Sequence, residues 1–214
     1  MDRVTVVTVN HKTLRYTTLC MQSLRRYYPK VPVVLIDNGS GDRSTEYIRA
    51  LSEQDPCVEC ILNALNLTHG PALHQGAGLA RTPYLFTLDS DCEIRAGGFL
   101  ERMLKLFDED PLLYALGQKV LVNAAGVKHP SGDKSKLNFC IRPWAMLVDR
   151  EKYLQLPSFK YQGSPTVANA WAALGRGWKL VDFPVGRFIR HRGRGTENLL
   201  GIRWDGKPRG RRKK

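Results

Sequence analysis

The stretch of sequence that decides the fold is Tyr84-Leu-Phe-Thr-Leu-Asp-Ser-Asp91, an apolar run that ends in two acidic residues. The apolar part predicts a strand buried in a sheet. Two carboxylates within three residues repel each other and gain little unless something positive lies between them. Mg²⁺ or Mn²⁺ suits that place, because hard cations take carboxylate and phosphate oxygens together. The stretch therefore predicts a buried strand that delivers a divalent-metal site.

Around this stretch, the first 90 or so residues alternate between strand and helix patterns. The predicted strands cover residues 4–9, 33–36, 57–62 and 84–88, and the predicted helices cover residues 13–27, 42–51 and 71–79. This alternation is typical of a mostly parallel sheet with helices on both faces. Further along, we expect helices over 98–107 and 165–174, a loop or hairpin over 123–136, and strands over 112–116, 139–148, 178–181 and 188–189. Without a repeat or linker in residues 1–185, one α/β domain is the simplest interpretation.

The net charge is +13, and most of it lies at the C-terminal end of the chain. Residues 186–214 hold eleven Lys and Arg against two acidic residues, a net charge of +9, so the other residues carry only +4. We therefore expect a nearly neutral domain over 1–185 and a basic C-terminal tail over 186–214. The tail predicts either contact with an anionic membrane or a solvated end. Nucleic acid is not an expected partner, because no interleaved aromatic residues or binding motif accompany the charge.

The sequence also limits the cellular setting. No run approaches the ~18 apolar residues that a membrane-spanning helix needs. The first residues enter a predicted strand at once, so we expect no signal peptide and a cytoplasmic protein, with the inner face of the membrane as an alternative through the tail. The five cysteines are scattered and odd in number, which is unlike a secreted disulfide framework. Cys57 and Cys60 form a lone CxxC pair, which predicts reduced thiols rather than a zinc site.

Polar groups follow three of the predicted strands at the point where each strand ends. Asn10 follows the first strand, Asp37 and Asn38 follow the second, and residues 89–91 follow the fourth. Ligands of open α/β sheets bind beyond the C-terminal ends of the strands. A single Asp after a strand is more often a turn residue or a helix cap. The convergence of three such ends is what predicts a ligand site.

Several motifs of the first half occur together. They are a Val-rich strand over residues 4–9, Asp37-Asn-Gly-Ser40, the spaced Asn66, Gly70 and Gly76, and the stretch over 84–91. These motifs resemble the GT-A glycosyltransferases of family 2, and Arg150-Glu151, Gly175 to Trp178 and His191 extend the resemblance more loosely. The resemblance implies a GT-A fold, a Rossmann-like and mostly parallel sheet flanked by helices in a single compact domain. It also implies a nucleotide-binding half over about 1–95 and an acceptor half over about 96–185.

The resemblance implies a nucleotide-sugar donor of the UDP or dTDP type. The Asp37 carboxylate would accept the N3–H of the uracil or thymine ring, and Asp89 would bind the ribose. The full set of implied donor-binding residues is Asn10, Asp37, Asn38, Asp89, Ser90, Arg190 and Arg192. The two arginines would neutralise the diphosphate leaving group, because a guanidinium matches phosphate geometry. His69 and His74 lie in the implied donor loop, where cap or surface roles are the alternatives.

A metal cofactor and an acceptor follow from the same resemblance. Asp91, with Asp89 and the late His191, would hold Mn²⁺ or Mg²⁺ between the donor phosphates; a surface histidine is the alternative interpretation of His191. The acceptor would be the hydroxyl of a glycan or of a lipid-linked sugar. We therefore expect a metal-dependent glycosyltransferase, although the residues do not indicate which sugar or which acceptor it uses.

One departure from the family pattern concerns the catalytic base. The family places it at the start of a helix that corresponds here to residues 164–166, where there is no carboxylate. The candidate bases are then Asp182, Asp149 and Glu151, in no fixed order. We expect inversion with a displaced base, and three alternatives stay open. They are a retaining transfer, a sugar-phosphate nucleotidyltransfer, and a module that binds sugar nucleotides without catalysis. Nucleotidyltransfer is disfavoured, because residues 10–13 do not form a Gly-rich basic loop.

Overall fold

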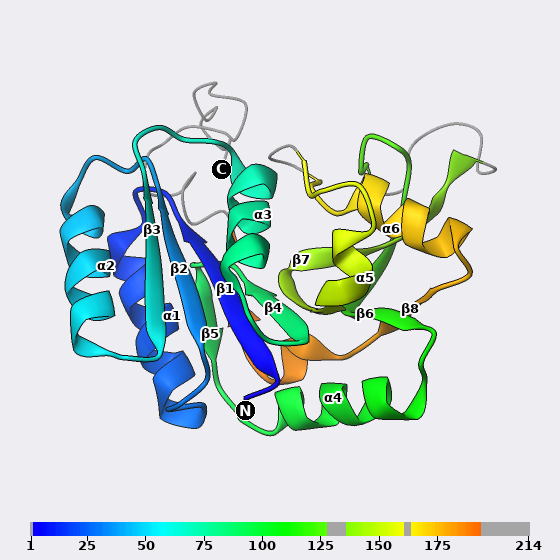
Figure 1. Cartoon of the computed structure of the whole chain (residues 1–214), viewed down its shortest axis with the longest axis horizontal. Helices are drawn as coiled ribbons and strands as arrows, with labels where there is room; N and C mark the ends of the chain where they lie inside the picture. Colours follow the sequence, from blue (N-terminus) through cyan, green and yellow to red (C-terminus); the bar gives the residue numbers. More distant parts are fainter. Residues whose placement is uncertain (1, 128–135, 161–163, 194–214) are drawn as a thin grey trace, which may run out of the picture.

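The computed structural model describes residues 2–127, 136–160 and 164–193, in which seven strands form one mixed sheet (Figure 1). The order of the strands across the sheet is β3-β2-β1-β4-β7-β6-β8. Their bounds are β1 (Val4–Asn10), β2 (Val33–Asn38), β3 (Val58–Asn63), β4 (Tyr84–Leu88), β6 (Leu113–Val122), β7 (Asn138–Asp149) and β8 (Lys179–Asp182). A separate two-stranded sheet pairs β5 (Cys92–Ile94) with β9 (Ile189–His191).

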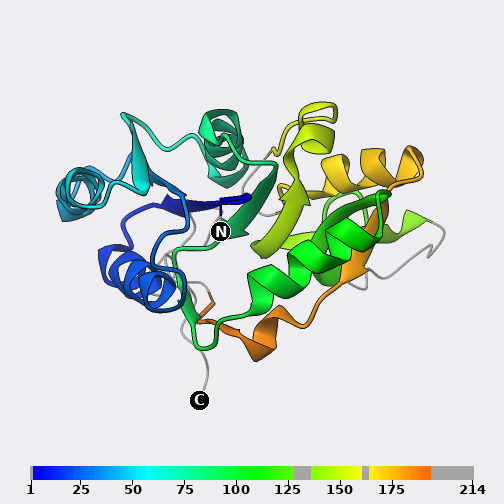
Figure 2. The same cartoon turned by 60° about the horizontal axis from the view of Figure 1, so that its bottom comes forward.

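Helices cover both faces of the large sheet (Figure 2). Their bounds are α1 (Leu14–Tyr27), α2 (Arg43–Gln54), α3 (His69–Leu79), α4 (Phe99–Glu109), α5 (Arg150–Leu154) and α6 (Val167–Gly175), with a 3₁₀ turn η2 (Val185–Arg187) before β9. One apolar core packs α1, α2 and α4 against one face, and a second packs α3, α5 and α6 against the other. Because side chains alternate along a strand, Val4 and Val6 enter the first core and Val7 enters the second.

The strands β3, β2, β1 and β4 are parallel, and β7 is the strand that runs against its neighbours β4 and β6. The β6–β7 ladder is interrupted, since Gly117 pairs with Met146 while Lys119 pairs with Ile141. One residue of β6 therefore faces four residues of β7, and β7 bulges outward. Gly117 allows the backbone of β7 to approach closely at this interruption, because a Cβ at residue 117 would lie 2.7 Å from the Ala145 carbonyl oxygen.

The structure confirms the predicted α/β fold. Residues 189–191, which belong to the predicted basic tail, form β9 and pair with β5 in the first half of the chain. Residues 194–214 of the predicted tail, and residues 128–135 of the predicted loop, lie outside the described residues. Within the described ranges, no helix combines the length and the apolar character that crossing a membrane requires.

Candidate functional site

The ends of β1, β2 and β4 lie side by side at one edge of the sheet. Asn10 pairs with Asp37 in the β1–β2 ladder, and β4 pairs with the other side of β1. Asp89 follows the last residue of β4 directly. The three predicted strand ends therefore do meet, because parallel strands share the edge at which they finish.

Asp37 is buried, with 1% of its surface exposed, and neutral donors of the chain already bond to its carboxylate. Its Oδ1 accepts from Asn10 Nδ2 at 3.0 Å and from the Ser40 hydroxyl. Its Oδ2 accepts from Thr45 Oγ1 at 2.5 Å. These three bonds leave about one of the four acceptor positions of a carboxylate. Asp37 thus ties the loop after β2 to β1 and α2, and its predicted contact with a nucleotide base stays a prediction.

Asn10 is fully buried at the centre of the same network. Its Nδ2 also donates to Ser40 Oγ at 3.0 Å, and its Oδ1 accepts from Thr13 Oγ1 at 2.8 Å and Thr17 Oγ1 at 2.7 Å. The amide therefore fastens the first turn of α1 to the end of β1. Its side-chain atoms bond within the chain, and its predicted contact with the donor stays a prediction.

Asn38 organises the loop that leads into α3. Its Nδ2 donates to Asn66 Oδ1 at 3.0 Å and to the Thr68 carbonyl oxygen at 3.2 Å, and its Oδ1 accepts from the Leu67 N–H at 3.1 Å. Gly39 permits this arrangement, because it has a φ of +69° and a Cβ there would lie 2.4 Å from the Leu65 carbonyl carbon. The loop brings His69, the first residue of α3, towards the end of β4.

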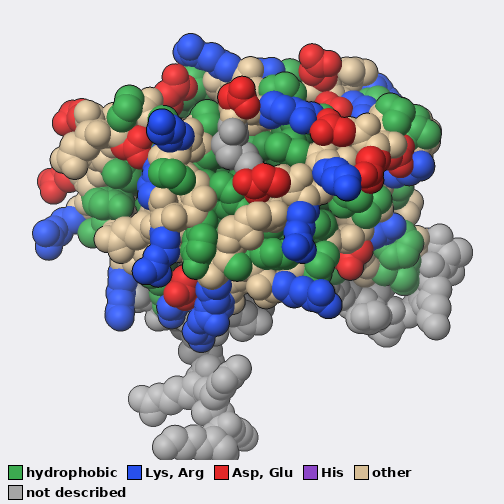
Figure 3. Space-filling model, turned by 90° about the horizontal axis from the view of Figure 1, so that it is seen from below, with side chains coloured by type: hydrophobic (Ala, Val, Ile, Leu, Met, Phe, Trp, Pro, Cys, Tyr) green, Lys and Arg blue, Asp and Glu red, His purple; other side chains and the backbone are tan. Residues whose placement is uncertain are grey.

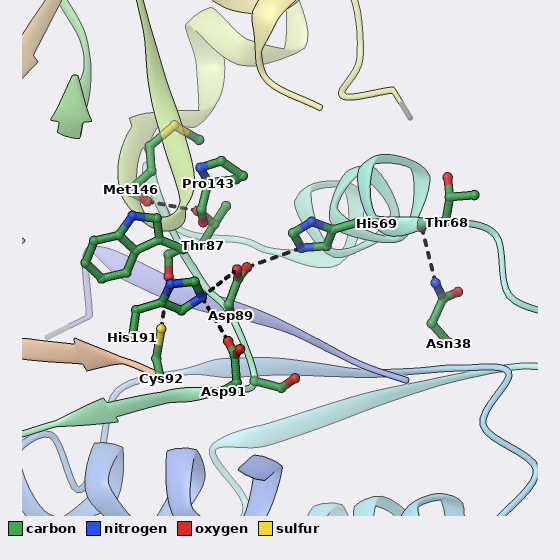
Figure 4. A network of polar contacts seen from close by, with 12 residues as sticks. Asn38, Thr68, His69, Thr87, Asp89, Asp91, Cys92, Pro143, Met146 and His191 are labelled. Atoms are coloured by element: carbon green, nitrogen blue, oxygen red, sulfur yellow. Dashed lines mark hydrogen bonds and ion pairs between the residues drawn. The ribbon is translucent and has the colours of Figure 1, made fainter. Parts of the chain in front are cut away.

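Asp89, Asp91 and His191 form a cluster at the end of β4 (Figure 4). His191 Nε2 lies 3.0 Å from Asp91 Oδ1 and 3.5 Å from Asp89 Oδ2. On the other side of Asp89, His69 Nε2 lies 3.4 Å from Oδ1, so the carboxylate stands between two imidazoles. The side chains of Asp89 and Asp91 are 26% and 11% exposed. Unlike Asp37, this cluster can reach solvent.

His191 reaches the cluster through the small sheet. Its partner in the β5–β9 ladder is Cys92, the residue after Asp91, and the Arg192 N–H donates to the Asp91 carbonyl oxygen at 3.0 Å. Residues 95 to 99 positions apart are thus joined by a three-residue ladder. The predicted proximity of His191 to the two acids is present in the structure.

The cluster favours a positive charge. Burial on its own lowers the pKa of His191, but its hydrogen bonds and charge interactions with Asp89 and Asp91 outweigh burial and raise that pKa to about 10. Burial raises the pKa of the adjacent Cys92 thiol well above its ordinary value. An imidazolium therefore balances the two carboxylates when nothing else does.

The donor set fits a divalent cation. Two carboxylates and one imidazole suit Mn²⁺ in particular, and carboxylates with phosphate oxygens suit Mg²⁺. Neighbouring ligands at ~2.1 Å from one octahedral ion lie ~3 Å apart, which agrees with the 3.0 Å between Asp91 Oδ1 and His191 Nε2. Ligand atoms of Asp91, Cys92 and His191 all lie within 4.8 Å of one another, and Asp89 joins this group through its 3.5 Å approach to His191.

The remaining predicted donor residues surround the cluster. Ser90 is buried, and its hydroxyl lies 3.1 Å from Thr13 Oγ1. Arg192 Nη2 donates to Glu93 Oε2 at 2.9 Å. Arg190 lies on β9 opposite Glu93 and is exposed. The two arginines therefore flank His191 along the chain, and the guanidinium of Arg192 is already paired with a carboxylate.

Two of the three candidate bases lie at the wrong edge of the sheet. Asp149 pairs with Tyr84 at the start of β4, its Oδ1 caps α5 by accepting from the Lys152 N–H at 3.0 Å, and its Oδ2 lies 3.1 Å from Lys152 Nζ. Glu151 lies on α5, which begins at that edge. The edge where the parallel strands begin carries interspersed acidic and basic side chains (Figure 3). Asp149 thus caps a helix, and neither residue shares the edge of the sheet that carries the metal cluster.

Asp182 is the candidate base that shares an edge with the metal cluster. It ends β8 opposite Gly117, and its Oδ1 accepts from the Lys119 N–H at 2.8 Å. The position where the family pattern places an acid has other contacts. Ser164 Oγ lies 3.5 Å from the Gly126 carbonyl oxygen, and Thr166 Oγ1 donates to the Ile141 carbonyl oxygen at 2.7 Å.

Sequence reasoning missed Trp144 and underrated His69. The indole of Trp144 is stacked on the His191 ring, with centroids 5.2 Å apart and an interplanar angle of 15°. One signal was available, because Pro143 precedes Trp144 in a predicted strand and proline within a strand marks an edge or a bulge. For His69, its place at the start of a helix also fitted a cap, and the sequence does not show that Asp89 lies beside it.

The chain resembles known glycosyltransferases in sequence and in fold. The model of glycosyl transferase family 2 matches residues 4–161. A protein of Haemophilus influenzae described as an uncharacterized glycosyltransferase is 28% identical over an alignment of 155 residues, and the match covers 66% of this chain and 60% of that protein. This chain therefore spans less than two thirds of the length of that relative.

Two solved structures resemble the fold. One is the mannosyltransferase PcManGT from Pyrobaculum calidifontis in complex with GDP-Man and Mn²⁺, with a TM-score of 0.68 and 19% identity, covering 85% of this chain and 55% of that one. The other is GalNAc-T7 with UDP, GalNAc and Mn²⁺, with a TM-score of 0.66 and 16% identity, covering 85% and 41%. The predicted GT-A fold is thereby confirmed. With a family model that matches most of its length, the chain belongs to glycosyl transferase family 2.

Proposed function

We propose that the protein transfers a sugar from a nucleotide diphosphate sugar to an acceptor hydroxyl, with Mn²⁺ or Mg²⁺ held by Asp89, Asp91 and His191. The observation that carries the proposal is the approach of His191 to two partly exposed carboxylates at the edge where β1, β2 and β4 end. A cation bound there would neutralise the negative charge that develops on the departing diphosphate. Arg190 on β9 and Arg192 directly after it would add positive charge beside the same phosphates.

The donor is a UDP- or dTDP-sugar in this proposal, and the acceptor is a glycan or a lipid-linked sugar. Recognition of the pyrimidine by Asp37 would use the remaining acceptor position of Oδ2, and it would require the residues that cover Asp37 to move, because Asp37 is only 1% exposed. The bound nucleotides named for the two similar structures include both GDP and UDP types, so the base has to be decided by measurement.

For the stereochemistry we favour inversion, with Asp182 as the base. The acceptor oxygen would form a bond to the anomeric carbon while its proton passes to the Asp182 carboxylate, and the bond from that carbon to the diphosphate would break. Three strand spacings of ~4.8 Å separate β4 from β8, so Asp182 lies ~14 Å across the sheet from the end of β4. This separation leaves room for a donor sugar and an acceptor between the metal cluster and the base.

The test is a calorimetric titration of the full chain with UDP, dTDP, GDP and ADP, each in the presence of Mn²⁺ and in the presence of EDTA. We expect tighter binding of UDP or dTDP in the presence of Mn²⁺. Equal affinity with Mn²⁺ and with EDTA would contradict the proposed metal site. Equal affinity for all four nucleotides would contradict the proposed preference for a uracil or thymine ring.

A second experiment separates an enzyme from a module that only binds donor, which the absence of an acid at residues 164–166 keeps as the alternative. Turnover of UDP-sugars is measured with a panel of acceptors, and the anomers of the product are read by NMR. Inverted product, lost in Asp182→Asn while UDP binding persists, supports the proposal. Retained configuration rules out the inverting mechanism, and normal turnover by Asp182→Asn rules out this base.

A further inference from the structure

The imidazole of His191 needs more than its own strand to face the two acids. In the described part of the chain, β9 is three residues long and pairs with β5 in a sheet of two strands. Such a short ladder sets the position of the backbone, but it leaves the side-chain torsions of His191 with several staggered choices. The two acids attract Nε2 itself, and a neighbouring group that packs against the face of the ring restricts the rotamer further.

Trp144 is that neighbour, and it comes from the large sheet. Its indole lies nearly parallel to the His191 ring, at 5.2 Å between centroids. The indole is itself held, because its Nε1 donates to Gln118 Oε1 at 2.9 Å. Its carbonyl oxygen accepts from the Asp89 N–H at 3.0 Å. One residue therefore contacts two members of the cluster, Asp89 through its main chain and His191 through its ring.

The bulge in β7 explains how a strand residue reaches this place. Residues 142–145 face a single residue of β6, so the segment leaves the regular ladder before β7 rejoins β4, where Ala145 pairs with Leu88. Thr87 Oγ1 donates to the Pro143 carbonyl oxygen at 2.5 Å and ties the bulge to β4. The bulge is thus anchored on both sides of Trp144, which fixes the backbone from which the indole extends, and the bond to Gln118 orients the ring.

We propose that Trp144 is a positioning residue of the metal site, whose indole keeps the edge of the His191 imidazole towards Asp89 and Asp91. This inference rests on the proposed metal-dependent function. Without the indole, the His191 side chain spreads over other staggered rotamers, from which Nε2 does not reach the carboxylates. The apparent affinity for a metal falls in proportion to the fraction of the competent rotamer, and the loss of the ring pair adds to this. We expect about three- to tenfold weaker binding.

The test is a titration of the full chain with Mn²⁺ in the absence of nucleotide. The EPR signal of free Mn²⁺ measures how much of the metal stays unbound. Trp144→Ala should bind Mn²⁺ three- to tenfold more weakly, and Trp144→Phe should recover most of the affinity because it keeps a stacked ring. Trp178→Ala is the matched control. Trp178 stacks on Tyr114 at 5.9 Å in the other core, so its loss should leave the Mn²⁺ affinity unchanged. Thermal melting of each variant reports general damage to the fold.

A double-mutant cycle decides whether Trp144 acts through His191. In the background of His191→Ala, the further change Trp144→Ala should have no effect on Mn²⁺ affinity. An equal loss in both backgrounds would overturn the inference, and so would wild-type affinity in Trp144→Ala. If the unaltered chain itself binds no Mn²⁺, the proposed metal-dependent function fails and the inference fails with it. The two failures are distinguishable. Failure of the metal-dependent function appears as no Mn²⁺ binding by the unaltered chain, whereas failure of the inference about Trp144 appears only when the variants are compared.

Discussion

The acidic residues at the ends of β2 and β4 look alike in the sequence and differ in the structure. Asp37 is closed off from solvent, and the neutral side chains of Asn10, Ser40 and Thr45 donate to it. Asp89 and Asp91 are partly exposed and face the edge of an imidazole. A buried carboxylate with three neutral donors is satisfied by its own chain. Two adjacent carboxylates that share one imidazolium are balanced only while a cation is present.

An acidic residue after a strand can therefore stabilise the fold or bind a ligand. The groups that donate hydrogen bonds to its carboxylate distinguish the two roles. Asp37 holds loops together, so its loss should be measured mainly as lost stability. Asp91 holds a charge, so its loss should be measured mainly as lost metal binding. Four variants test which charged residues stabilise the fold and which bind a ligand.

The largest effect is expected for Asp91→Ala. Mn²⁺ affinity of the full chain should fall by at least about 100-fold, because losing a ligand costs more than losing a group that orients one. The free energy of unfolding should change little, since repulsion from Asp89 is removed together with the bond to His191. EPR titration with Mn²⁺ and urea denaturation measure the two quantities. Unchanged Mn²⁺ affinity would show that the cluster is not the metal site.

For Asp37→Ala we expect the opposite pattern. The free energy of unfolding should fall by about 2–4 kcal/mol, because three buried donors lose their acceptor. Asp42→Ala is the control, since it removes the N-cap of the same helix α2 and should cost about 1 kcal/mol. Urea denaturation measures both. A loss below 1 kcal/mol combined with lost selectivity for UDP would assign Asp37 to the ligand instead of the fold.

A smaller effect is expected at the opposite edge of the sheet. Asp149→Ala should lower the free energy of unfolding by about 1 kcal/mol through the lost cap of α5, and it should leave turnover unchanged. Denaturation and a donor-turnover assay under saturating substrates are the measurements. Lost turnover with normal stability would return Asp149 to the list of candidate bases.

The smallest effect is expected for Arg192→Ala. Its pair with Glu93 is partly exposed, so the stability should change by less than about 0.5 kcal/mol. A loss of UDP binding free energy that exceeds this change in stability would indicate a contact between Arg192 and the diphosphate. The difference in UDP affinity between the variant and the unaltered chain should then become smaller as salt is added. Equal affinity of the variant and the unaltered chain would remove Arg192 from the donor-binding residues.

The first half of the fold was accessible from sequence because its signals are local. The run Val4 to Val9, the cap at Asp42 and the stretch over 84–91 each mark an element by its own residues, and each element lies where it was predicted. The later strands were harder to delimit, because β6 and β7 extend through pairing with each other. The predicted strand over 112–116 becomes a strand that reaches Val122 for this reason.

The sequence by itself determined that strands and helices alternate and that polar groups stand at the ends of three parallel strands, because periodicity and turn chemistry act over a few residues. It also determined that residues 164–166 carry no acid. The tertiary structure was needed to show that Asp37 is satisfied internally, that Asp149 lies at the far edge, and that Trp144 and His69 adjoin the cluster at the end of β4. These outcomes depend on strand order, register and one bulge, which arise from pairing between residues tens of positions apart.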